Sequence, residues 1–159
     1  MKIHIATDHA GFELKSKILD YLISKGHEII DHGAKSFDSD DDYPDYIFPC
    51  AKAVSKDKNS FGIILGGSGQ GEAIAANRIR GVRAIVYYGF EETIPILSRE
   101  HNNANIISIG ARFVSENEIY DVIEKWLNIS FSKGRHYRLS LIHISEPTRQ
   151  AEVSYAVFC

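Results

Sequence analysis

A glycine-rich segment that ends in a glutamate is the part of this sequence best suited to chemistry. Residues 62–78 read GIILGGSGQGEAIAANR, with four glycines among the six residues 66–71 and Glu72 directly after them. Glycines between a strand and a helix let backbone N–H groups approach a ligand, and a helix N-terminus favours an anion. Neither a Walker lysine nor a clean GxGxxG pattern is present. The segment predicts an anion-binding turn, although a tight turn without a ligand would also use glycines.

Glu72 has two possible roles in this segment. A glutamate in a first helical turn is stabilised by the helix dipole by about 0.3–1 kcal/mol, with no part in catalysis. The same dipole lowers the carboxylate pKa, so a catalytic base here would need partial desolvation to offset it. Ser68 lies four residues before Glu72, which is not the capping-box spacing. Its hydroxyl therefore remains available to orient the carboxylate or a substrate hydroxyl.

Apolar runs alternate with helical patterns along the chain. We expect strands over residues 2–7, 28–31, 61–65, 82–87 and 106–109, and helices over residues 12–25, 46–55, 72–78, 93–101 and 116–127. Strands separated by helices predict right-handed crossovers and a mostly parallel sheet, and uniformly apolar strands predict helices on both faces. The expected fold is α/β, a three-layer αβα sandwich with a Rossmann-like sheet of about five strands in flavodoxin-like order.

Two histidine-containing pairs stand near ends of the predicted elements. In parallel sheets of this kind, ligands bind beyond the carboxyl ends of the strands. Asp8-His9 follows the first strand, and His101-Asn102 ends the helix after the fourth. We expect both pairs at the same edge of the sheet as the glycine loop, although each histidine alone could be a surface residue.

Three arginines are candidates for phosphate recognition. Arg112 follows the fifth strand, and Arg135 and Arg138 lie beyond the last helix. A guanidinium fork binds phosphate with two parallel hydrogen bonds. A solvated charge without a ligand is the alternative for each of them.

Composition and spacing argue against several other classes of protein. The chain has 159 residues and a net charge of −3, which gives no sign of the basic face of a nucleic-acid binder. Apolar runs of about 18 residues are absent, so no membrane span is expected. The histidines lack HxH or HxxxH spacing, and Cys50 and Cys159 form no CxxC pair, so neither a metal site nor a disulfide is predicted. The N-terminus does not read as a signal peptide, and we expect a cytoplasmic protein.

Four motifs in order give the chain a family resemblance. ATDHAGFELK, GGSGQGEAIAANR, REHNNAN and GRHYR, spread over residues 1–138, together resemble the ribose-5-phosphate isomerase B and galactose-6-phosphate isomerase family. Some members of that family carry a cysteine base at the position of Gly66, and others have glycine there and a glutamate base at the position of Glu72. This sequence is similar to the second group, because Gly66 has no side chain and Cys50 lies outside the motif.

The resemblance implies catalytic roles for a few residues. Glu72 would remove the proton from C2 of the open-chain aldose and return it at C1. Ser68 and the backbone amides of the loop would stabilise the enediolate oxygen. His101, assisted by Asp8, would open the furanose ring by proton transfer. The amides come from five residues: Gly67, Ser68, Gly69, Gln70 and Gly71.

The resemblance also implies how the substrate is held. Asn102 would bind substrate hydroxyls, and His9, Arg112 and Arg135 would hold the phosphate. The site of this family lies between two subunits, with the His101-Asn102 segment supplied by the partner, so a homodimer or homotetramer is implied. The resemblance also implies that the substrate is a small sugar phosphate and that neither a metal nor an organic cofactor is needed.

Two other functions remain open at this point. A galactose-6-phosphate isomerase subunit would share the fold and most motifs, but those enzymes resemble assemblies that divide the site between unlike chains. Here all candidate groups lie in one chain, which favours ribose 5-phosphate and ribulose 5-phosphate as substrates. A non-enzymatic, flavodoxin-like phosphate- or nucleotide-binding module is the second alternative. It gives no reason for Glu72 to accompany Asp8, His9 and His101.

The last part of the chain differs in character from the rest. We expect an isomerase domain over residues 1–138 and a non-native tail over residues 139–159, which resembles translated vector sequence. Relatives usually carry a second phosphate-binding arginine at the position of Leu139. Arg138 is one residue early, which on a helix turns it by about 100°. It is the candidate to replace the missing arginine.

Overall fold

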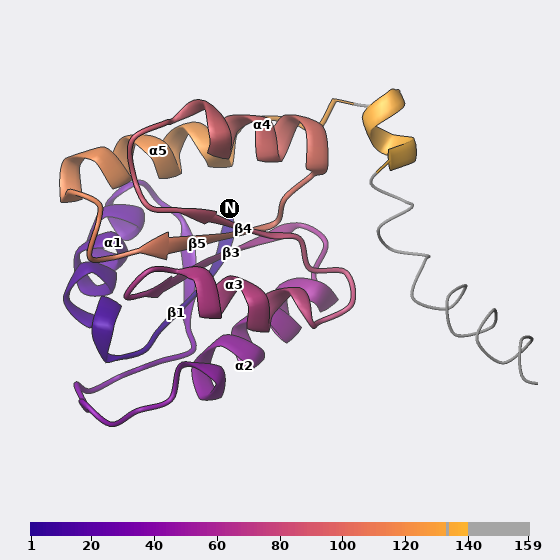
Figure 1. Cartoon of the computed structure of the whole chain (residues 1–159). Helices are drawn as coiled ribbons and strands as arrows, with labels where there is room; N and C mark the ends of the chain where they lie inside the picture. Colours follow the sequence, from indigo (N-terminus) through magenta and orange to yellow (C-terminus); the bar gives the residue numbers. More distant parts are fainter. Residues whose placement is uncertain (133, 140–159) are drawn as a thin grey trace, which may run out of the picture.

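The computed structural model describes residues 1–132 and 134–139, and within them a succession of strands and helices (Figure 1). The strands are β1 (Lys2–Thr7), β2 (Glu28–Asp31), β3 (Ser60–Gly66), β4 (Ala84–Tyr87) and β5 (Ile106–Gly110). The helices are η1 (His9–Gly11), α1 (Phe12–Ser24), α2 (Tyr43–Lys56), α3 (Gln70–Asn77), α4 (Thr93–Asn102) and α5 (Glu116–Asn128), and residues 135–139 are also helical. All expected elements are present, and their bounds move by at most three residues.

The five strands form one parallel sheet, as the sequence predicted. Their order is β2-β1-β3-β5-β4. The order begins as in flavodoxin but ends with the last two strands exchanged. Every residue of β5 is buried, whereas β4 is largely half-buried, so the more deeply covered strand lies inside and β4 takes the edge.

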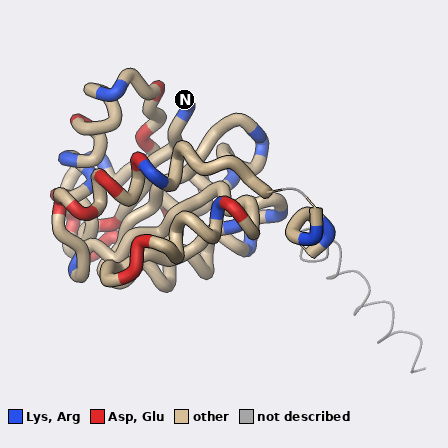
Figure 2. Tube along the Cα trace, turned by 90° about the horizontal axis from the view of Figure 1, so that it is seen from above, with Lys and Arg blue, Asp and Glu red and all other residues tan. Residues whose placement is uncertain are grey.

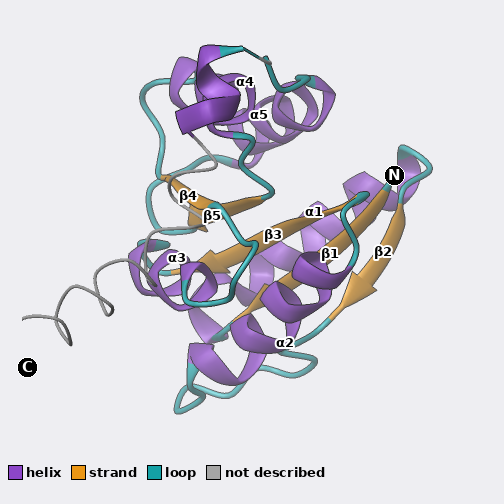
Figure 3. Ribbon diagram, turned by 90° about the vertical axis from the view of Figure 1, so that its right-hand side faces the viewer, coloured by secondary structure: helices purple, strands orange, loops and turns teal. Residues whose placement is uncertain are grey.

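Helices cover both faces of the sheet and complete the three layers (Figure 3). Helices α1 and α5 pack on one face, where Ile18, Ile123 and Trp126 bury against residues of the central strands. Helices α2 and α3 pack on the other face around Ile47 and Ile64. Helix α4 lies beside α5, and Trp126 Nε1 donates to Ser98 Oγ at 3.3 Å. These two cores fix the central strands whose ends carry the site.

The strands are buried in the middle of the sheet and less so at its edges. Strands β1, β3 and β5 are almost entirely buried. Strand β2 alternates between exposed and half-buried residues, because an edge strand has a neighbour on one side only and less helix above it. The edge strands contribute little to the core.

Helix α2 begins earlier than the sequence indicated. It starts at Tyr43, so Pro44 occupies its first turn, where a missing backbone N–H costs nothing. The early start brings the Tyr43 side chain to the carboxyl edge of the sheet, where it lines a cavity.

Charged residues of both signs are interspersed along the chain (Figure 2). Within residues 1–132 and 134–139, every helix is too short or too polar to cross a membrane.

Candidate active site

A cavity of about 350 Å³ opens where β1, β3 and β5 end. Strands β1 and β3 are neighbours, and the order of the sheet reverses between them, which is where ligands bind in folds of this kind. The pairing of Thr7 with Leu65 and of Gly66 with Gly110 brings the three strand ends together. The cavity is lined by Asp8, His9, Ala10, Tyr43, Gly67, Ser68, Gly71, Glu72, Arg112 and Phe113.

The glycines of the loop serve mainly to leave room for neighbouring side chains. Among those of residues 66–71, Gly69 has a positive φ, at 76°, and precedes α3. A Cβ at Gly66 would overlap the Glu72 carboxylate, and one at Gly67 would lie 3.2 Å from the Arg112 Cζ. A Cβ at Gly71 would lie 3.0 Å from the Tyr43 ring. A positive φ thus explains the glycine at 69, and close approach of neighbouring side chains explains the other three.

Glu72 is a buried carboxylate in the first turn of α3. Its side chain and backbone are together 5% exposed. Burial raises the pKa of Glu72, its own backbone N–H opposes that shift, and the negative charge of Asp8 adds to it. The increase of the Glu72 pKa by desolvation is thus larger than the decrease caused by the N–H group at the helix N-terminus. This is the condition for a carboxylate base at this position.

Asp8 and His9 are held at the end of β1 by local hydrogen bonds. Asp8 Oδ1 accepts the Ala10 N–H at 3.0 Å and caps η1. His9 Nδ1 lies 2.7 Å from Asp41 Oδ1, and the His9 backbone N–H donates to the same oxygen at 3.0 Å. The hydrogen bond with Asp41 raises the pKa of His9, burial opposes the shift, and Asp8 adds to it.

Asp8, His9 and Asp41 could also offer three ligand atoms to a cation, since these atoms lie within 4.8 Å of one another. Two facts favour hydrogen bonding over coordination. The 2.7 Å between His9 Nδ1 and Asp41 Oδ1 is a direct hydrogen-bond distance. Arg112 is close enough to lower the pKa of His9 and would repel a cation in the same way. The expectation of a metal-free site stays a prediction.

Arg112 and Ser68 both line the cavity beside the glycine loop. The Arg112 backbone N–H donates to the Gly67 carbonyl at 3.3 Å, and its guanidinium lies beside Gly67. Ser68 is exposed, and its Oγ accepts the Gln70 N–H at 3.4 Å. The cavity is therefore lined by two buried carboxylates, those of Asp8 and Glu72, by two cationic or cationisable groups and by the glycine loop.

The expectation that His101-Asn102 shares an edge with the glycine loop is wrong for a single chain. Both residues end α4, which runs back from the carboxyl edge of β4 to the start of β5. They lie at the amino edge of the sheet, and the five residues of β5 separate the two edges by roughly 13 Å. A helix between parallel strands must return the chain to the starting edge, so its last turn cannot stand beside the strand ends.

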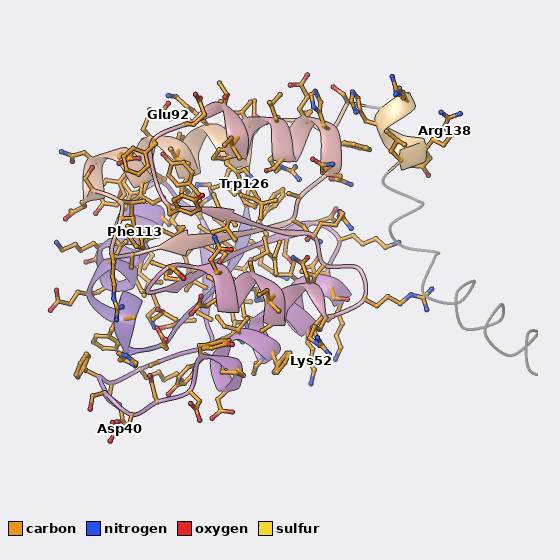
Figure 4. All side chains as sticks on the ribbon, in the orientation of Figure 1. Asp40, Lys52, Glu92, Phe113, Trp126 and Arg138 are labelled. Atoms are coloured by element: carbon orange, nitrogen blue, oxygen red, sulfur yellow. The ribbon has the colours of Figure 1, made fainter. Side chains whose placement is uncertain are left out.

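The C-terminal arginines also lie away from the cavity. Arg135 and Arg138 are exposed on the short helix of residues 135–139. Its His136 ring stacks on His101, with ring centroids 4.2 Å apart. Phe113 of the cavity and Arg138 stand on opposite sides of the molecule (Figure 4). Residues 140–159, which hold most of the predicted tail, lie outside the described residues.

Three side chains at the site were missed from the sequence. Asp41 lies in the connection from β2 to α2, Tyr43 is the first residue of α2, and Phe113 follows Arg112. The rule that placed the other candidates after strand ends applies equally to β2, but the nine residues between β2 and Asp41 obscured it. Cys50, by contrast, is fully buried, and burial raises the pKa of its thiol, which disfavours a thiolate base.

The fold and the site define a doubly wound α/β protein. Its ligand site at the sheet's carboxyl edge is lined by carboxylates and by groups that can bind an anion. The chain belongs to the ribose/galactose isomerase family, whose model matches residues 3–141. It is 42% identical over 153 residues to ribose-5-phosphate isomerase B of Mycolicibacterium paratuberculosis, covering 95% of each chain. It is 38% identical to the Escherichia coli ribose-5-phosphate isomerase B, covering 85% of this chain and 89% of that one.

Solved structures of the same family share the fold. The ribose-5-phosphate isomerase B of Mycoplasma genitalium, solved with bound ribulose-5-phosphate, superposes with a TM-score of 0.82 at 33% identity and covers 99% of this chain and 97% of that one. The Thermotoga maritima enzyme has a TM-score of 0.84 at 40% identity, with coverage of 90% and 97%. The family expected from the four motifs is therefore confirmed.

Proposed function

We propose that this protein interconverts ribose 5-phosphate and ribulose 5-phosphate by moving a proton between C2 and C1. The observation that carries the proposal is the buried Glu72 carboxylate, whose raised pKa and position beside the loop amides suit a base. Its relatives are named for this reaction, and the Mycoplasma genitalium relative binds ribulose-5-phosphate.

The proposed chemistry needs one base and one oxyanion site. Glu72 takes the proton from C2 of the open-chain aldose, and the electron pair moves to the C1 carbonyl oxygen, which gives an enediolate. The backbone N–H groups of Gly67, Ser68, Gly69, Gln70 and Gly71 are the candidates to stabilise this oxygen. Protonated Glu72 then returns the proton to C1, while the Ser68 hydroxyl passes the O2 proton to O1. The reaction conserves electrons overall.

Phosphate binding is assigned to the cationic side of the cavity. His9 and Arg112 both line it, and each suits a phosphate dianion. Arg135 and Arg138 lie on the far side of the same chain, so they would reach this cavity only from another copy.

A second subunit is therefore part of the proposal. In a homodimer, or a tetramer built from such dimers, the His101-Asn102 segment and the 135–139 helix of one chain would complete the cavity of the other. His101 would open the sugar ring with the help of Asp8, and Asn102 would bind hydroxyls. Mixing inactive Glu72→Gln and His101→Asn chains after dissociation tests this, because hybrid dimers would contain one intact site. No recovery of activity in the mixture would contradict site sharing.

A coupled assay of ribose 5-phosphate isomerisation with the purified chain tests the activity itself. We expect turnover that persists in EDTA. Loss of activity that a divalent ion restores would overturn the metal-free mechanism, and absence of turnover would overturn the function. Galactose 6-phosphate, assayed in parallel, tests the other substrate of the family. A cytoplasmic location stays a prediction.

A further inference from the structure

Asp41 holds His9 through two hydrogen bonds to one oxygen. Asp41 Oδ1 accepts the His9 backbone N–H at 3.0 Å and lies 2.7 Å from His9 Nδ1. The Asp41 side chain is 5% exposed, while that of His9 is 31% exposed and lines the cavity. The His9 ring thus lines the cavity, whereas Asp41 is buried next to Nδ1 and is not among the lining residues.

The loop that carries Asp41 is anchored to the strand end that carries His9. The Thr7 N–H donates to the Gly33 carbonyl at 2.8 Å, and the Ala34 N–H donates to the Thr7 carbonyl at 2.7 Å. Buried Lys15 donates to the Ala34 carbonyl at 2.6 Å and pairs with Asp31 at 2.8 Å. The start of the β2–α2 connection, which carries Asp41, is thus hydrogen-bonded to the end of β1, which precedes His9.

The contact decides which ring nitrogen of His9 can bind a ligand in the cavity. An Nδ1–H that donates to Asp41 leaves Nε2 as the ring nitrogen available to the cavity. The charged groups around the ring are Asp41 from the β2–α2 loop, Asp8 from its own turn and Arg112 from the segment after β5. Asp41 Oδ2 is buried and has no hydrogen-bond partner among the described residues, and burial together with the charge of Asp41 raises the pKa of the nearby Tyr46 hydroxyl. The two contacts with His9 on Oδ1 therefore matter for stabilising this buried carboxylate.

We propose that Asp41 is a positioning residue, which orients His9 with Nε2 toward the substrate phosphate and favours the imidazolium that binds this dianion. The inference rests on the proposed function, in which His9 is a phosphate ligand. Asp41 itself touches no reacting atom, so its effect should appear in substrate binding more than in turnover.

The first experiment replaces Asp41 with Asn in the full chain. Asparagine keeps an acceptor oxygen for both His9 N–H groups and removes the charge. At pH 8 we expect the KM for ribose 5-phosphate to rise about tenfold or more, with kcat within about threefold of the parent value. The KM of D41N should also begin to rise at a lower pH than that of the parent, because a less stabilised imidazolium loses its proton earlier. Asp40→Asn is the matched control, since it makes the same change one residue away, without the His9 contact.

A double-mutant cycle separates a role through His9 from general damage to the loop. With His9 replaced by Asn, D41N should change the KM no further. Equal KM increases with and without His9, or an equal effect of Asp40→Asn, would overturn the proposal. An unchanged KM and pH profile in D41N would overturn it as well.

NMR titration of the His9 ring tests the contact without reference to activity. We expect the imidazole pKa to be lower in D41N than in the parent and the Nδ1-protonated tautomer to be less populated. If these changes occur while the parent shows no isomerase activity, the proposed function fails and the contact's role in His9 stands. If the parent is active and D41N alters neither the titration nor the KM, the positioning role fails alone.

Discussion

The carboxylate of Glu72 occupies the space that a side chain at Gly66 would fill. A Cβ at residue 66 would overlap the carboxylate oxygens of Glu72. The family resemblance implies a base at position 66 or at position 72. Side chains at these two positions, at the end of β3 and the start of α3, would therefore occupy the same space. A chain with glycine at 66 leaves this volume to the glutamate.

Glu72→Gln should abolish most of the activity. We expect kcat to fall by at least about 10²–10⁴-fold, because general-base catalysis of that order is lost, while the KM changes little. The measurement is steady-state isomerisation of ribose 5-phosphate. Cys50→Ala is the control, and we expect it to leave the chemistry unaffected. A large loss of kcat in folded C50A, or near-parental turnover in E72Q, would refute the assignment.

Gly66→Ala should impair catalysis through Glu72. The added methyl displaces the carboxylate, and a misplacement of about 1 Å can cost 10²-fold in rate. We expect a kcat reduction of that order with a folded protein, checked by circular dichroism and kinetics on the same sample. Full activity in G66A would show that the carboxylate works from another position.

The decrease of kcat/KM at low pH should follow the protonation of Glu72. The base must be ionised, and burial raises its pKa, so kcat/KM should fall as the pH drops through a value above that of an ordinary glutamate. Asp8→Asn removes a negative charge that also raises this pKa, so the decrease should move to lower pH. A decrease that D8N leaves in place would mean that another group controls it.

His101→Asn should impair turnover of cyclic ribose 5-phosphate more than that of an already acyclic aldose phosphate, one too short to close a furanose ring. Both substrates are assayed from aldose to ketose, because the equilibrium constant fixes the ratio of kcat/KM in the two directions of one reaction. We expect kcat/KM to fall at least about tenfold more for ribose 5-phosphate, in line with a lost general acid. Equal losses for both substrates would assign His101 another role.

Leu139→Arg should strengthen phosphate binding. Leu139 is exposed on the same short helix as Arg135, and an arginine there would restore a charge-assisted hydrogen bond. We expect the KM to fall by up to about tenfold. An unchanged KM would favour Arg138 as the working substitute.

Much of the fold could be predicted because its signals are local. The apolar runs of β1, β3 and β5 and the helical spacing of α1 and α5 are written in consecutive residues. The exchange of β4 and β5 in the sheet order depends on which strand buries better against both helical layers, and no single segment encodes that comparison.

The candidate site divides in the same way. The sequence alone determined the glycine loop, Glu72, the Asp8-His9 pair and Arg112, because each lies in a segment that follows a strand and parallel strands end at one edge. Only the tertiary structure decided that Asp41 and Tyr43 join them, since the path of the long β2–α2 connection sets where Asp41 lies and where α2 begins at Tyr43. It also placed His101 at the opposite edge, because a crossover helix must carry the chain back to where the next strand begins.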